Sequence, residues 1–365
     1  MYFALTDDQL MIRESAESFL AEASDSAAVR RCAGTADAAL WQRIARELGW
    51  CATAIPEACG GLGLGQVELV LLAEQMGRRL PCVPFFATVG MAATALQEAG
   101  SEAARTQWLP RIAAGEISAT VALGARDVGL GECAITARRD GAGWVLDGHS
   151  EHVPDGADAT LLLVVARTDA GLGLFSLQGK PDGLTRTPLA TWDLTRRLAH
   201  IELAGVRAER VDAGGADFAR VEALAALLLA AEQLGGAQQC LDLTLAYCAG
   251  RSQFGQTIAA FQAVKHRCAE MMVKVETTRS IVYGAAALAD TRPATRALLL
   301  EIGAAKALAS EAFFDCAQEA IQLHGGVGFT WAYDPHLYFK RAQAGSRWLG
   351  TPDRWRERIA AALLD

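Results

Sequence analysis

From Phe218 to the C-terminus, apolar side chains recur at the three- and four-residue spacing of an amphipathic helix. We predict three long helices here, at about residues 219–250, 258–290 and 294–322, followed by two shorter ones. A helix with one apolar stripe needs another element to cover that stripe. Three long helices and a shorter fourth therefore predict an up-down four-helix bundle, which we place at residues 216–365.

The N-terminal part of the chain has the same helical period, and we expect residues 1–116 to form a helical domain. Thr6 is a predicted N-cap, and Gln9 completes a capping box at the start of the first helix. The later helices are expected through Trp41 and Leu48, from Val67 to Met76, near Val89 to Glu98, and from a Ser101 cap to Gly115.

Between residues 117 and 215 the pattern changes to short apolar runs separated by turn residues. Asp147-Gly148 is a dipeptide typical of a tight hairpin turn. Closely spaced runs of this kind predict a small β barrel or sandwich. The whole chain is thus expected to be α+β, with a helical domain, a middle β domain and a helical bundle. The runs are Ala119–Ala122, Gly143–Leu146, Ala159–Ala166, Gly171–Leu177 and Leu198–Leu203.

The composition is typical of a soluble cytoplasmic protein. The chain has 365 residues, 52% of them hydrophobic, and its net charge of −8 argues against a nucleic-acid partner. Its nine cysteines include no CxxC pair, which is typical of reduced thiols. The N-terminal segment lacks the regions of a signal peptide, and the most apolar run, Ala223–Ala231, is too short to span a membrane.

A glycine pair, Gly325-Gly326, follows the third long helix. Glycine lacks a Cβ, so this backbone can turn tightly and approach another group closely. Exposed N–H groups beside such a turn suit a phosphate or a flavin. The segment is equally typical of a plain helix-loop-helix with glycine caps. The final helix is predicted to begin with Thr351 as its N-cap and Pro352 at its first position.

Three motifs resemble those of the acyl-CoA dehydrogenase family, in the family's order and spacing. They are Ile55–Gly63, then Arg251–Gln256 with Phe261–His266, then Gln322–Gly326. The resemblance extends from about residue 5 to the C-terminus. It implies that family's fold, FAD as cofactor, α,β-desaturation of an acyl-CoA substrate, and an electron-transfer acceptor protein.

In this family a neighbouring subunit reaches over the adenine and pyrophosphate of the flavin. By the resemblance, Arg251 contacts the pyrophosphate, because a guanidinium fork suits phosphate oxygens. Without the resemblance, Arg251 would be an ordinary solvated arginine at a helix end. The resemblance assigns these residues to cofactor binding: Arg251, Gln253, Phe261, Gln262, Gln322, Gly325, Gly326 and Thr351.

The half of the flavin site that comes from the chain's own middle domain departs from the family. Leu123–Gly131 stands where the family has a hydroxyl-bearing loop similar to Thr-Glu-Pro-Gly-Ala-Gly-Ser-Asp. His152-Val153-Pro154 stands where the family has a Trp-Ile-Thr segment that hydrogen-bonds flavin N5. Because proline offers neither a hydroxyl nor an N–H, we expect this contact to be missing.

The family's catalytic base also has no counterpart at the matching positions. The usual glutamate position holds Leu349, and the alternative position at the start of the long helix holds Ala225. Neither side chain can accept a proton, so no catalytic residue is assigned. Glu222 lies nearly one helical turn from Ala225 and is the only close substitute; the alternative is a solvated carboxylate in the helix's first turn.

The remaining histidines and aromatic residues are given no role in catalysis or in direct cofactor contact. His149 and His152 are three apart on an expected strand and so point to opposite faces, which argues against a metal pair; no metal site is predicted. His324 is expected near the cofactor without touching it. Four aromatic residues are expected to pack the bundle and the subunit contacts: Trp331, Tyr333, Trp348 and Trp355.

Four functional hypotheses remain open. The first is a partner subunit of a hetero-oligomeric (α2β2) acyl-CoA dehydrogenase, similar to steroid side-chain-degrading enzymes, whose base comes from a homologous catalytic subunit. The second is a self-sufficient homo-oligomeric acyl-CoA dehydrogenase with a relocated base. The third is a flavin-dependent monooxygenase, which needs no α-proton base, and the fourth is a flavin-free scaffold on the same fold.

Overall fold

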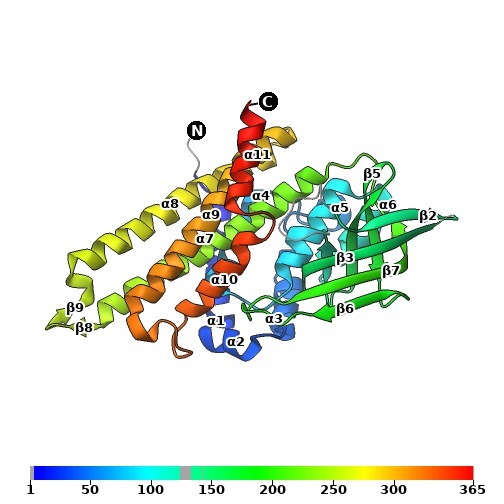
Figure 1. Cartoon of the computed structure of the whole chain (residues 1–365). Helices are drawn as coiled ribbons and strands as arrows, with labels where there is room; N and C mark the ends of the chain where they lie inside the picture. Colours follow the sequence, from blue (N-terminus) through cyan, green and yellow to red (C-terminus); the bar gives the residue numbers. More distant parts are fainter. Residues whose placement is uncertain (1–3, 124–132, 142, 365) are drawn as a thin grey trace. The chain divides into compact units, whose positions relative to one another are not determined.

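The computed structural model describes residues 4–123, 133–141 and 143–364. These residues belong to two compact units that each combine separate stretches of the chain. The first unit comprises residues 1–31, 70–81 and 226–365, and the second comprises residues 32–69 and 82–225. The predicted α+β class is confirmed, with helices toward both ends of the chain and strands between them (Figure 1). The two boundaries between the three domains proposed from the sequence stay a prediction.

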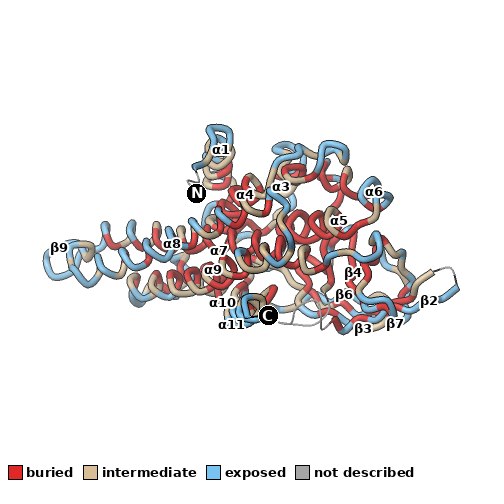
Figure 2. Tube along the Cα trace, turned by 90° about the horizontal axis from the view of Figure 1, so that it is seen from above, coloured by how far each residue is buried: buried red, intermediate tan, exposed pale blue. Residues whose placement is uncertain are grey.

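The longest helix, α7 (Phe218–Gly250), begins in the second unit and continues into the first. Every residue from 221 to 237 is buried, so this part of the helix has no solvent-facing side (Figure 2). An apolar surface around the whole circumference is what the sequence supplies here, with alanine and leucine dominating Ala223–Ala231. The remaining helices of the bundle are α8 (Gln262–Asp290), α9 (Thr295–His324), α10 (Pro335–Arg347) and α11 (Pro352–Leu364).

The boundaries of the long helices agree closely with the expected ones, and the break between α8 and α9 falls at residues 291–294. One start differs, because α8 begins at Gln262 and not near residue 258. A short 3₁₀ turn, η6 (Ile258–Ala260), and the extended backbone of Phe261 precede it. The two-residue strands β8 (Ser252–Gln253) and β9 (Gln256–Thr257) form a hairpin between α7 and α8, and Figure 2 shows this end of the bundle as exposed.

Helix α4 (Gln66–Arg79) crosses α7 with the two backbones in contact. A Cβ added to Gly77 would lie 1.8 Å from the Glu232 carbonyl oxygen, and one added to Gly235 would lie 1.8 Å from the Glu74 carbonyl oxygen. No side chain larger than hydrogen fits at either place. The glycines therefore determine how closely these two helices approach.

One buried carboxylate, Glu74, and partly exposed ion pairs of Arg78 surround this crossing. Glu74 is 2% exposed and is bound by Arg279 and by the Tyr283 hydroxyl, which donates to Oε2 at 2.5 Å. Arg78 bridges Glu17 at 2.6 Å and Asp242 at 2.7 Å, so α4 is tied to both α1 (Asp7–Ala23) and α7. Buried charges of this kind are tolerated because each has a close partner.

In the second unit, five strands pair in a closed circuit, β4–β2–β3–β7–β5 and back to β4, which makes the predicted β domain a barrel. β1 adds to β4 in parallel, and β6 adds to β7. Phe175, Leu162 and Ile201 are fully buried members of its core. The strands are β1 (Ala119–Ala122), β2 (Thr136–Asp140), β3 (Gly143–Pro154), β4 (Leu161–Thr168), β5 (Gly171–Gln178), β6 (Leu184–Pro188) and β7 (Leu198–Arg210).

The hairpin turn predicted at Asp147-Gly148 is wrong. These residues lie inside β3, at a shift in its register with β7, and Gly148 has a φ of 130°. A Cβ on Gly148 would lie 2.7 Å from the Ala134 carbonyl oxygen. The glycine thus permits a bulge and a close backbone approach, two further roles that an Asp-Gly pair can have in a strand. β2 and β6 had no expected counterpart in the sequence.

The N-terminal helices begin as expected. Thr6 and Gln9 form the predicted capping box, and the Ser101 side chain accepts from the Ala104 N–H at 3.2 Å. Among the described residues, no helix is long and apolar enough to cross a membrane. The remaining elements are α2 (Ser26–Cys32), α3 (Ala38–Gln42), η1 (Arg43–Glu47), η2 (Trp50–Ala52), η3 (Glu57–Cys59), η4 (Phe86–Ala93), α5 (Thr94–Ala99), α6 (Glu102–Ala113) and η7 (Gly325–Val327).

We predict that Gly235→Ala lowers the free energy of unfolding by about 3 kcal/mol, because the new methyl group overlaps backbone atoms of Glu74 and Arg78 that cannot rotate away. Chemical denaturation measures the change. Gly284→Ala is the matched control, since Gly284 is an exposed glycine of α8 with nothing within 4 Å of an added Cβ. It should leave stability unchanged or raise it by about 1 kcal/mol. Equal effects of the two substitutions would contradict the close crossing.

Candidate functional site

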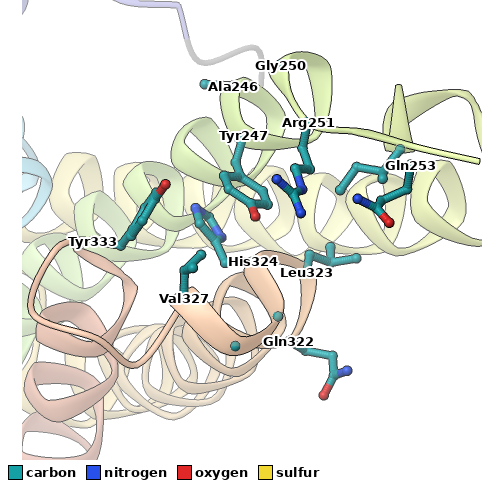
Figure 3. Close-up of a pocket in the computed structure, with 13 residues that line it drawn as sticks. Ala246, Tyr247, Gly250, Arg251, Gln253, Gln322, Leu323, His324, Val327 and Tyr333 are labelled. Carbon is teal, nitrogen blue, oxygen red and sulfur yellow. The ribbon is translucent and has the colours of Figure 1, made fainter. Parts of the chain in front are cut away.

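A pocket of about 620 Å³ lies in the first unit, between the C-terminal end of α7 and the C-terminal end of α9 (Figure 3). The pocket brings together five of the residues assigned to cofactor binding from the sequence. Those five are Arg251, Gln253, Gln322, Gly325 and Gly326. They lie up to 75 residues apart in the chain (326 − 251 = 75), and they meet because α7 and α9 run in the same direction and both end at this pocket.

Glycines leave the rim of this pocket open. Gly250, Gly325 and Gly326 each have nothing within 4 Å of a Cβ position, so side chains there would extend into open space. Gly325 has φ 63° and ψ −144°, a conformation that is essentially restricted to glycine. The rim is therefore suited to a ligand that approaches the backbone closely.

Arg251 supplies a positive charge at this rim. Its side chain is exposed, and it has no ion-pair partner among the residues that the structure describes. Its backbone is held on both sides, since its N–H donates to the Tyr247 carbonyl at 2.9 Å and its carbonyl accepts from the Ile258 N–H at 2.8 Å. A guanidinium fork on a fixed backbone beside an open glycine rim fits a diphosphate.

Aromatic rings form one wall of the pocket. Tyr247 stacks on His324 with ring centroids 4.2 Å apart, and Tyr333 meets the two rings edge-on at 5.9 and 6.1 Å. His324 Nδ1 lies 2.7 Å from the Ala320 carbonyl oxygen, and burial lowers the pKa of His324. The lowered pKa favours the neutral ring, and Nδ1–H is the donor because the Ala320 carbonyl can only accept. His324 was expected near the cofactor; Tyr247 and Tyr333 were not singled out as pocket residues.

The other three residues assigned to cofactor binding lie outside the pocket lining. Phe261 packs edge-on against Phe254, which is 90% exposed, with ring centroids 6.2 Å apart. Gln262 is exposed at the first position of α8. Thr351 caps α11, where its hydroxyl accepts from the Arg354 N–H at 3.3 Å. Their assignment to FAD stays a prediction.

The two positions at which the family carries its catalytic base are buried and apolar in this chain. Leu349 is 9% exposed, Ala225 is 3% exposed, and neither can accept a proton. The alternative that Glu222 is a solvated carboxylate is wrong, because Glu222 is only 6% exposed. The reason lies in α7, where every residue from 221 to 237 is buried, so this part of the helix has no solvent-facing side.

The turn that carries Leu349 is held from two directions. Leu349 has a φ of 55°, an unusual value for a large side chain, and its carbonyl accepts from Trp355 Nε1 at 2.9 Å. The next carbonyl, of Gly350, lies 3.3 Å from Nζ of Lys306, which is fully buried. Lys306 also donates to Ser310 Oγ at 2.8 Å, and burial lowers the pKa of Lys306 to about 7.

The segment that matches the family's flavin-ring contact is built into the barrel. Val153 is 2% exposed, and the Pro154 carbonyl accepts from the Thr120 hydroxyl at 2.6 Å. The preceding loop, Leu123–Gly131, lies outside the described residues except for Leu123. No group of three or more metal-ligating side chains occurs in the described part of the chain, and His149 instead stands 5.7 Å from the His200 ring.

The four aromatic residues assigned to packing divide into two groups. Trp355 is fully buried in the first unit, as expected, and Trp348 is half-buried. Trp331 is 55% exposed and Tyr333 is 38% exposed. Trp331 stands edge-on to His336, with ring centroids 4.8 Å apart.

Comparisons with known proteins identify the family. The model of the acyl-CoA dehydrogenase N-terminal domain matches residues 6–116, and that of the C-terminal domain matches residues 222–364. The acyl-CoA dehydrogenase IpdE2 of Mycobacterium tuberculosis is 35% identical over 363 residues, which are 98% of each chain. IpdE2 of Mycolicibacterium smegmatis is 32% identical over 99% of this chain and 100% of its own.

Solved structures agree with this result. The Tcur3481-Tcur3483 steroid ACAD is 30% identical with a TM-score of 0.90 and covers 98% of both chains. The ChsE4-ChsE5 complex from Mycobacterium tuberculosis is 29% identical with a TM-score of 0.90 over 100% of this chain and 99% of its own. The chain belongs to the acyl-CoA dehydrogenase family. It is accordingly an FAD-dependent oxidoreductase that acts on acyl-CoA.

We predict that Arg251→Ala lowers FAD occupancy, with a loss of about 1.5–3 kcal/mol in binding, because a charge-assisted hydrogen bond to a phosphate is removed. Absorbance at the flavin band per mole of this chain, measured in the assembly with its partner in which the wild-type chain binds FAD, gives the occupancy. Arg292→Ala is the control, since it removes an exposed arginine from the turn between α8 and α9. Unchanged flavin content in Arg251→Ala, at an unchanged melting temperature, would contradict a role in FAD binding.

A second prediction concerns Lys306. Because burial lowers its pKa to about 7, the unfolded chain binds one more proton than the folded chain between pH 7 and the ordinary lysine pKa. The contribution of Lys306 to stability therefore rises with pH across this window, by up to about 1.4 kcal/mol per pH unit. Denaturation of wild type and Lys306→Met at pH 7, 8 and 9 should show a shallower rise in the variant. Parallel curves would indicate that Lys306 keeps its charge in the fold.

Proposed function

We propose that this chain is a subunit of a hetero-oligomeric acyl-CoA dehydrogenase, in which it completes an FAD site and a homologous partner supplies the catalytic base. One observation carries the proposal: the pocket around Arg251 keeps its cationic and glycine groups, while Leu349 and Ala225 leave both expected base positions apolar and buried. We expect this pattern in a subunit that contributes FAD-binding groups to a partner's active site and performs no proton transfer itself.

When bound, FAD supplies the chemistry of the reaction by accepting a hydride from the acyl β-carbon. This chain's task would be binding and orientation. Arg251 would bind the pyrophosphate, and the backbone of Gly325-Gly326 would approach it from the facing helix. Gln253 and Gln322 would offer amide groups at the rim, although Figure 3 shows the Gln322 side chain pointing away from the Tyr247–His324 pair.

The chain's own base positions would take no part in proton transfer. Leucine at residue 349 would present an apolar group and exclude water. The α-proton of the substrate would then be removed by a carboxylate of the partner. A positioned general base contributes about 10²–10⁴-fold to such a rate, so the partner's group would be indispensable.

The similar proteins support a steroid-derived acyl-CoA as the substrate class. One of the similar solved structures is described as a steroid ACAD, and another as a complex of two differently named chains. We extend this to an α2β2 assembly of the present chain with a homologous catalytic subunit. We further propose an electron-transfer acceptor protein as the redox partner of this assembly, and we place the enzyme in the cytoplasm.

A second candidate function rests on Glu222. This carboxylate is buried in α7, nearly one turn before Ala225, which is the kind of environment that a relocated base requires. In that case the chain would be a self-sufficient, homo-oligomeric acyl-CoA dehydrogenase.

Flavin content separates the two candidates. We expect the chain expressed alone to contain little FAD, and the same chain co-expressed with a catalytic homologue to form a stable complex with stoichiometric FAD. The complex should keep acyl-CoA-dependent dye reduction when this chain carries Glu222→Gln, and should lose it when the partner's glutamate is changed. Glu232→Gln is a matched control, because Glu232 is another buried glutamate of the same helix and is ion-paired to Arg341.

Two results would overturn the first candidate. One is a stoichiometric yellow homo-oligomer purified without any partner. The other is loss of turnover in Glu222→Gln at unchanged flavin content, which would identify Glu222 as the base and favour the self-sufficient enzyme.

A further inference from the structure

Arg30, on the short helix α2, makes an unusual set of contacts with a segment 300 residues further along the chain. Its Nε donates to the Trp331 carbonyl at 3.0 Å, and its Nη2 donates to the Tyr333 carbonyl at 2.8 Å. Its Nη1 forms an ion pair with Asp334. All three nitrogens of one guanidinium thus bind the loop formed by residues 328–334, which connects η7 to α10.

A second residue of α2 strengthens this arrangement. The Ser26 hydroxyl donates to Asp334 Oδ1 at 2.6 Å, so the same carboxylate is bound from two positions one helical turn apart. The Arg30 and Asp334 side chains are only 22% and 21% exposed. Partial burial and a shared geometry distinguish this cluster from an isolated surface ion pair, which contributes little.

Apart from Arg30 and Ser26, the loop is held mainly by packing: Trp331 stands edge-on to His336 of α10, and Gly328 lies against the backbone of Ile321 in α9. It contains no regular helix or strand, and its backbone is closed by the turn hydrogen bonds of Thr330 to Val327 and Tyr333 to Thr330, at 3.0 and 3.2 Å. Its aromatic side chains Phe329 and Trp331 are 68% and 55% exposed. Arg30 therefore provides the main polar attachment of the loop to another element.

Tyr333 connects this loop to the pocket. Its ring lines the pocket and meets Tyr247 and His324 edge-on, and Figure 3 shows it beside His324. The carbonyl that Arg30 binds belongs to the same residue as this ring. A guanidinium attached to Tyr333, its neighbour Asp334 and Trp331 limits how far the ring can move from the wall.

We infer that Arg30 is a positioning residue for the pocket: it holds the loop 328–334 so that Tyr333 completes the aromatic wall beside the FAD pyrophosphate site. The inference rests on the proposed function only in the identity of the ligand. Arg30 itself does not line the pocket, so its effect on binding passes through Tyr333.

The first test measures hydrogen exchange of the loop amides in the purified chain. Arg30→Ala should raise the exchange rates at residues 328–334 about tenfold or more, while the amides in the middle of α8 keep their rates. Arg30→Lys keeps the charge but not the planar fork, so it should restore only part of the protection. Arg31→Ala, which removes the exposed neighbouring arginine, should change nothing. Unchanged loop exchange in Arg30→Ala would overturn the inference.

The second test is a double-mutant cycle on FAD affinity. FAD is titrated into flavin-stripped wild type, Arg30→Ala, Tyr333→Ala and the double variant, in the assembly in which wild type binds it. Each single change should weaken binding about tenfold, and the double variant should be no weaker than Tyr333→Ala, because Arg30 acts through Tyr333. Additive losses would show that Arg30 has a general structural effect and would overturn the inference.

The two tests separate this inference from the proposed function. If wild type binds no FAD in any assembly, the proposed function fails, and the hydrogen-exchange result still decides whether Arg30 holds the loop. If Arg251→Ala weakens FAD binding but Arg30→Ala does not, the proposed function stands and the positioning role is refuted.

Discussion

The close crossing of α4 and α7 organises the first unit of this protein. Glycines at residues 77 and 235 bring the two backbones into contact, so α4 sits inside the bundle and not on its surface. From there its polar side chains reach several elements at once. Glu74 binds Arg279 and Tyr283 of α8, and Arg78 binds Glu17 of α1 and Asp242 of α7. The Arg78 carbonyl also accepts from the Tyr338 hydroxyl of α10 at 2.6 Å.

The pocket depends on this packing, because its two walls are the ends of long helices. Tyr247 and Gly250 lie at the end of α7, and His324 and Gly325 lie at the end of α9. A helix end can carry a binding group to a fixed place only if the helix itself is held along its length. The buried charges around Glu74 and the apolar surface of α7 do this, while the glycines at the rim keep the pocket open.

The same packing explains why the expected base positions are unsuited to proton transfer. Ala225 lies in the part of α7 that is buried on all sides, and Leu349 lies in a turn whose carbonyls are bound by Trp355 and Lys306. The turn is thus held in place although the residue it carries cannot act as a base. Glu222 shows the limit of reasoning from charge alone, since a carboxylate near a helix start is usually solvated and this one is buried.

Much of the fold was determined by the sequence itself, because it depends on local periodicity and caps. The long helices, the Thr6 capping box and most of the barrel strands follow from the spacing of apolar side chains and from turn and capping residues. The resemblance to the family also assigned Arg251 and Gly325 to cofactor binding. What the sequence could not provide is the outcome of contacts between distant segments.

Three features were decided only by the tertiary structure. Asp147-Gly148 forms a bulge and not a turn, because the backbone of residues 134 and 135 passes close to Gly148. Glu222 is buried, because neighbouring elements surround α7 completely at that point. Arg30 reaches the loop 328–334 across 300 residues of chain, and no local pattern distinguishes it from its exposed neighbour Arg31. In each case the partner atoms come from a remote part of the sequence, and only the packed fold brings them within contact distance.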